Sequence, residues 1–114
     1  MAIILLLGLE SNLGEQLGRV LEHLGQRVHA EALEPGTLEN SEADLVFARS
    51  QDLHTILKTR PDLPVVVVSR LPEVSAWLDA LEQGAADYCG APFEAAQVRW
   101  VLNTSLAPTR RRAA

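Results

Sequence analysis

The sequence contains one cysteine, few aromatic residues and no apolar run of membrane-spanning length. Cys89 has no second cysteine to pair with, which excludes an internal disulfide, and no group of cysteines and histidines has zinc-site spacing. The apolar runs are far shorter than the roughly 20 residues that a membrane span needs. The chain opens with MAIILLLG, which lacks the basic residues of a signal peptide. We therefore expect a cytoplasmic protein with no bound metal and no membrane contact.

Basic charge is also scarce. Lysine and arginine number 10 against 15 acidic residues, which gives a net charge of −5, whereas a nucleic-acid surface is usually basic. The one basic cluster, Arg110–Arg112, follows Pro108 at the C-terminus. We interpret residues 107–114 as a tail or the start of a linker, and residues 1–106 as a single domain. We expect no direct contact with nucleic acid.

Short apolar runs, in contrast, are abundant. In Leu63–Ser69, four consecutive valines leave no polar alternation, which is typical of a strand covered on both faces in a parallel sheet. Similar runs occur at Ile3–Leu7, Asp44–Ala48 and Ala86–Cys89, and Arg27–Glu31 has the alternating pattern of an edge strand. The sequence therefore predicts five strands.

Apolar residues recur at helical spacing between these strands. Asn12 and Glu15 resemble a capping box at the start of the first helix, and Gly25 suits its end. Ala32–Ala43 is acidic and contains Pro35-Gly36, so at most a turn or two of helix fits there. The apolar stripe of a later helix, expected to pack on the sheet, is formed by Val74, Trp77, Leu78 and Leu81. Alternating strands and helices predict a doubly wound α/β fold of the flavodoxin type, with its functional residues at the carboxyl ends of the strands.

The C-terminal half resembles a response-regulator receiver domain. Gly84–Phe93, GAADYCGAPF, is similar to the receiver signature GA-x-DY-L-x-KPF, and the valine strand precedes it at the family's spacing. The resemblance covers nearly the whole chain and is weakest from Ala32 to Leu53. It implies a CheY-like, five-stranded parallel sheet in the order 2-1-3-4-5, with a shortened second helix and a cis peptide bond before Pro92.

The same resemblance places a phosphorylation pocket whose chemistry is largely missing. The family's acidic pair, phosphoacceptor aspartate, hydroxyl and lysine fall on Gly8 and Leu9 (with Glu10 just beyond), Arg49, Ser69 and Ala91. Only the hydroxyl remains, together with Tyr88 at the family's aromatic switch position. This implies a degenerate receiver, or pseudo-receiver, that is not phosphorylated, is not an enzyme and needs no cofactor. Glu10 and Arg49 are either an ion pair that replaces the metal–phosphate site or two solvated charges.

Trp100 lies about 180° from the apolar side of the last helix, on its solvent face. In receivers the fourth helix, fifth strand and fifth helix commonly mediate pairing, which here implies an interface of Trp77, Arg99 and Trp100, with Trp77 mostly in the core. The implied partners are a histidine kinase, an effector domain or a second copy in a homodimer. The alternative is a flavodoxin-like domain that binds a small ligand or nucleotide in a pocket left open by Gly8 and Ala91.

Overall fold

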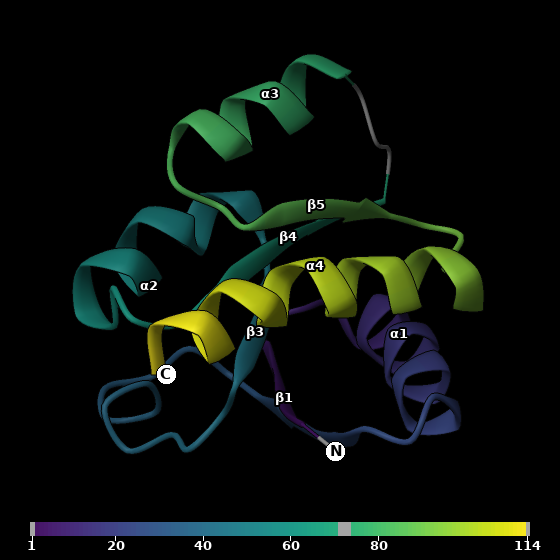
Figure 1. Cartoon of the computed structure of the whole chain (residues 1–114), viewed down its shortest axis with the longest axis horizontal. Helices are drawn as coiled ribbons and strands as arrows, with labels where there is room; N and C mark the ends of the chain where they lie inside the picture. Colours follow the sequence, from purple (N-terminus) through teal and green to yellow (C-terminus); the bar gives the residue numbers. More distant parts are fainter. Residues whose placement is uncertain (1, 71–73, 114) are drawn as a thin grey trace.

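Five parallel strands form one sheet in the order β2-β1-β3-β4-β5, as predicted (Figure 1). The structure, a computed structural model, describes residues 2–70 and 74–113, with side chains for residues 2–70 and 74–106. The strands are β1 (Ile3–Leu7), β2 (Arg27–Glu31), β3 (Leu45–Ala48), β4 (Val65–Ser69) and β5 (Asp87–Gly90). The peptide bond between Ala91 and Pro92 is cis, which confirms that prediction.

The helices are α1 (Ser11–His23), α2 (Leu53–Thr59), α3 (Val74–Glu82) and α4 (Ala95–Ala113), and a 3-10 turn, η1 (Ser50–Asp52), leads into α2. Within the described part of the chain, none of them is long and apolar enough to cross a membrane. The backbone of α4 continues through residues 107–113, which the sequence assigned to a tail. The division of the chain at residue 106 therefore stays a prediction.

Each face of the sheet has its own apolar core, because side chains alternate along each strand. Val65 and Val67 face α2 and α3, whereas Val66 and Val68 face α1 and α4. Figure 1 shows these helices on the two sides of the sheet. The four valines thus contribute to both cores, as their uninterrupted apolar pattern predicted.

The crossover between β2 and β3 contains turns at residues 35–40 and no assigned helix, which agrees with the expected shortening. Leu38 is 2% exposed and anchors this loop in the core under α2. Arg60 fixes the loop from outside, since its Nη1 donates to the carbonyls of Leu38 at 2.8 Å and Ser41 at 3.1 Å. A side chain from α2's end thereby supplies hydrogen bonds that a helix would have made within its own backbone.

The predicted capping box on α1 is wrong. The helix begins at Ser11, so Asn12 lies inside its first turn, and the N-cap residue Glu10 makes no side-chain capping bond. Asn12 instead accepts a hydrogen bond from the Gln16 amide. Gly25, with a φ of 87°, follows the helix end as expected, in a conformation that other residues rarely adopt.

The apolar stripe of α3 faces solvent, which contradicts the prediction that it packs on the sheet with Trp77 in the core. The exposed fractions are Val74 69%, Trp77 42%, Leu78 51% and Leu81 37%. Ala80 is the buried residue of α3, and Ala76 is half-buried. The helix therefore rests on the sheet through alanines. Helical spacing shows that residues share a face, but it does not say which way that face points.

Candidate functional site

The carboxyl ends of the strands bring together the positions at which the sequence placed a degenerate pocket. Gly8 follows β1, Arg49 follows β3, Ser69 ends β4 and Ala91 follows β5. These residues lie at one edge because the strands are parallel. The N–H of Ala91 donates to the Ser69 carbonyl at 3.0 Å, which extends the pairing of β4 with β5 into this edge.

Arg49 pairs with Asp52, and this ion pair is the central polar contact of the site. Arg49 Nε donates to Asp52 Oδ2 at 2.9 Å across the η1 turn. The side chain of Asp52 is 12% exposed and that of Arg49 is 45% exposed, so the carboxylate is the more protected partner. The carboxylate therefore accepts from a guanidinium and makes no capping hydrogen bond to the backbone of α2.

Gly8 leaves the space that this ion pair occupies. A Cβ built on Gly8 would lie 3.2 Å from Asp52 Oδ2 and 3.8 Å from Arg49 Nε, and the φ of Gly8 is +67°. A carboxylate side chain at position 8 would thus compete with the Arg49–Asp52 pair for the same space. The lack of an acid at position 8 and the presence of the Arg49–Asp52 ion pair therefore depend on each other.

Glu10 pairs with Arg70, which lies just beyond β4. Both side chains are about half exposed, at 56% and 51%. Both expectations for Glu10 and Arg49, an ion pair with each other or two solvated charges, are therefore wrong, because each residue pairs with a different partner. The Glu10–Arg70 pair joins the loops that follow β1 and β4. The Arg49–Asp52 pair joins the end of β3 to the start of α2.

Asp52 and Arg70 belong to this site, although neither was named as a candidate residue from the sequence. Asp52 had a detectable signal, because residues three apart in a helical turn are neighbours and Arg49 precedes it by three. Arg70 directly follows the strand residue Ser69, which places it at the functional edge of the sheet. Residues 71–73 lie outside the described residues, so the prediction from sequence that Pro72 occupies the first turn of a helix stays a prediction.

Gly8 and Ala91 border different hollows among those that the described residues form, so the expected ligand pocket between them stays a prediction. Gly8 borders a hollow beside Leu9 and Glu31, whereas Ala91 borders one beside Pro92 on the α4 side of β5. No group of three or more residues of metal-ligating type comes together among the described residues.

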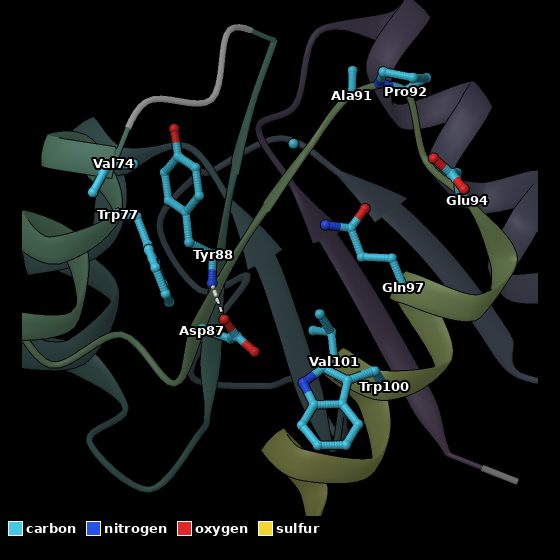
Figure 2. A pocket seen from close by; sticks show the side chains of 11 residues that line it. Val74, Trp77, Asp87, Tyr88, Ala91, Pro92, Glu94, Gln97, Trp100 and Val101 are labelled. Atoms are coloured by element: carbon cyan, nitrogen blue, oxygen red, sulfur yellow. Dashed lines mark hydrogen bonds between the residues drawn. The ribbon is translucent and has the colours of Figure 1, made fainter.

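A groove of about 500 Å³ runs between α3 and α4 over β5. Figure 2 shows Trp77 and Trp100 on either side of Asp87, with the Tyr88 ring turned toward Val74. Asp87 Oδ1 accepts a hydrogen bond from the Tyr88 N–H at 2.7 Å, and no described cation pairs with this carboxylate. Trp100 is 66% exposed, so its predicted position on the solvent face of α4 is confirmed. Arg99 is also exposed.

Burial affects one further group of the sheet, Cys89 on β5. Its side chain is inaccessible, and desolvation followed by the nearby Asp87 charge raises the pKa of the thiol from 9.0 to about 11. A protonated, buried thiol is a packing residue rather than a nucleophile.

Comparison with known proteins finds a partial sequence match and similar solved structures. No protein-family model matches the chain. Sixty residues, 53% of the chain, are 38% identical to a stretch of the DNA-binding transcriptional regulator NtrC of Rhizobium meliloti (strain 1021), and they span 12% of that protein. The chain thus covers only a small part of the length of this relative.

The solved structures superpose over nearly the whole chain. NtrX from Brucella abortus, in complex with ADP, gives a TM-score of 0.84 at 22% identity over 98% of this chain and 28% of that one. A response regulator receiver domain protein from Clostridium thermocellum gives 0.79 at 21% identity, over 96% and 98%. A CheY-like receiver domain protein from Methanospirillum hungatei JF-1 gives 0.79 at 18%, over 98% of both chains. At these identities the likeness concerns the fold.

Proposed function

We propose that this chain, which has the fold of response-regulator receiver domains, is a signalling module that accepts no phosphoryl group and acts by contact with another protein. The observation that carries the proposal is the apolar face of α3, which points away from the sheet. The residues at the carboxyl ends of the strands support the first half of the proposal, and the α3–β5–α4 surface supports the second.

Phosphoryl transfer to a protein side chain needs a nucleophile and, usually, a divalent cation that offsets the charge of the transferred group. The residue after β3 is Arg49, whose guanidinium stays cationic and cannot attack phosphorus. Gly8 and Leu9 offer no side-chain oxygen to a cation, and Glu10 is paired with Arg70. The nearest carboxylate, Asp52, is largely buried and already accepts from Arg49. Among the residues that the structure describes, these contacts support a site with neither an available carboxylate nucleophile nor a magnesium ligand set.

Intact-mass spectrometry after incubation with acetyl phosphate and Mg²⁺ tests this half of the proposal. We expect no mass gain. A stoichiometric adduct that hydroxylamine removes would contradict it, since hydroxylamine cleaves acyl phosphates. The Asp52→Asn variant identifies the acceptor in that case, because loss of the adduct would assign it to Asp52.

The α3–β5–α4 surface carries all five large apolar side chains that are exposed in the described part of the chain. They are Val74, Trp77, Leu78, Leu81 and Trp100. Isolated exposed apolar residues are ordinary, but a cluster that includes two tryptophans is typical of a protein–protein contact. The clustering therefore favours protein contact over the ligand-binding alternative as the function of this surface.

The charge of this surface favours a different protein over a second copy. From residue 74 to residue 106, the acids are Asp79, Glu82, Asp87 and Glu94, and the one base is Arg99. A two-fold symmetric pair would place these acids against themselves, and facing like charges oppose association. A partner that combines basic and apolar side chains matches the surface better, as a segment of a kinase or effector could.

Site-specific photo-crosslinking tests the contact surface. A photoreactive side chain at Trp100 should capture a defined protein in cells of the source organism, whereas one at the exposed Lys58 of α2 should not. The captured protein is then purified and titrated with the unmodified chain and with Trp100→Ala. We expect Trp100→Ala to weaken binding while its melting temperature stays unchanged. Equal capture at both positions, or capture at neither, contradicts the proposed surface, as would a partner that Trp100→Ala binds normally.

A further inference from the structure

A hollow of about 370 Å³ opens between the carboxyl ends of β3 and β4, beside α3. Its polar lining consists of Arg49, Ser50, Gln51, Ser69, Arg70 and Tyr88. None of the described residues that line it is acidic. The lining therefore presents two permanent positive charges together with hydroxyl and amide groups that can donate hydrogen bonds.

Carboxylates hold the two guanidinium groups from outside the hollow. Asp52 accepts from Nε of Arg49, and Glu10 accepts from Nη2 of Arg70, but neither acid lines the hollow. A guanidinium has five N–H donors, and each of these pairs is recorded through a single nitrogen. The acids thus orient the guanidinium groups and leave N–H donors for a ligand.

This lining selects one chemical class of ligand. Cations are disfavoured beside two arginines without a carboxylate in the lining, and a neutral ligand would gain no attraction from the two positive charges. The planar fork of arginine matches the oxygens of phosphate or carboxylate groups, and it does so without a metal ion. A volume of this size accommodates a phosphate group with a small substituent.

We propose that this hollow binds a small phosphate-bearing oxyanion reversibly, through Arg49 and Arg70 and without a divalent cation. Binding forms and breaks no covalent bond, so this is a ligand site and not a phosphorylation site. The proposal does not depend on the α3–β5–α4 contact surface.

Titration with inorganic phosphate in the presence of EDTA tests this site, with sodium chloride used to hold ionic strength constant. Amide NMR signals of Ser50 and Gln51 should shift in a saturable way. The melting temperature should rise by about 5 °C once phosphate reaches roughly ten times its dissociation constant. Arg70→Gln should weaken binding by about tenfold or more, because it removes charged hydrogen bonds.

Arg19→Gln is the matched control, since Arg19 is also exposed and also pairs with a carboxylate, that of Glu15 on α1. It changes net charge equally and should bind phosphate like the unmodified chain. Arg49→Lys is a second test that retains the charge beside Asp52 but loses the fork, and it should bind more weakly while circular dichroism shows an intact fold.

Two results would overturn the proposal. One is the absence of any saturable shift of these amide signals. The other is equal stabilisation of the unmodified chain, Arg70→Gln and Arg19→Gln, which would reflect the general stabilising effect of phosphate on protein surfaces. Because inorganic phosphate is not a phosphoryl donor, either outcome is independent of the acetyl phosphate experiment.

Discussion

Leu78→Ala measures directly whether the apolar face of α3 points outward. Leu78 is 51% exposed in the middle of that face. Leu102, on the buried side of α4, is 4% exposed and provides the same substitution in a packed environment. Alanine is the best helix former, so neither substitution weakens a helix through propensity.

The two expected losses of unfolding free energy differ several-fold. Full burial of a leucine side chain stabilises by about 1.5–3 kcal/mol, so the half-exposed Leu78 should lose about 1 kcal/mol or less. Leu102→Ala removes a fully packed side chain and leaves a cavity, for which about 2–5 kcal/mol is typical. If α3 packed its stripe on the sheet, the two losses would be alike.

Urea unfolding followed by circular dichroism gives both values, and unchanged m-values show that the denatured state is comparable. A loss for Leu78→Ala that equals that for Leu102→Ala would refute the outward orientation of this face. It would also remove the main support for the proposed contact surface, whereas the strand order and the ion pairs at the strand ends would be unaffected.

Three further predictions concern the carboxyl edge of the sheet and its core. Gly8→Ala should destabilise the fold by about 1–2 kcal/mol, measured by urea unfolding, because its φ of +67° disfavours a side chain; unchanged stability would contradict that backbone conformation. A double-mutant cycle with Arg49→Gln and Asp52→Asn should give a coupling free energy above the roughly 0.3–0.5 kcal/mol of an exposed helical ion pair, since Asp52 is mostly buried. A coupling free energy of zero would contradict the Arg49–Asp52 ion pair. Because the folded-state pKa of Cys89 is raised from 9.0 to about 11, its contribution to stability should be complete below pH 9 and disappear as pH rises through 11. Cys89→Ala should flatten that part of the pH–stability curve, and an identical curve would contradict the shift.

The strands were predictable from sequence because they are covered on both faces. A run such as Leu63–Ser69 has only one environment in which it is stable, and Ile3–Leu7 has the same property. Topology then followed, since alternating strands and helices admit few arrangements. The positions of Gly8, Arg49 and Ser69 at one edge of the sheet were consequences of that topology.

The contacts within that edge were not predictable in the same way. Arg49 meets Asp52 because a single 3-10 turn follows β3, and its geometry is not fixed by composition. Glu10 meets Arg70 across 60 positions of the chain, with charges that carry no pairing information of their own. The orientation of α3 was missed for another reason, since the residue that α3 buries is Ala80, whose small side chain contributes little apolar signal.

The packing of α3 on the sheet through a small residue, Ala80, has a consequence for the motion of this helix. Ala80 is the buried residue of this helix, and a small side chain contributes little burial energy. The free energy that holds α3 in place is therefore small compared with that of β4, whose valines lie in both cores. Such elements open locally without global unfolding, so amide hydrogens of α3 should exchange with solvent well before those of β4. A protein that covered Val74, Trp77 and Leu78 would bury the apolar side chains that the sheet leaves exposed. Binding of that protein would then slow the local opening of α3, the helix that it contacts.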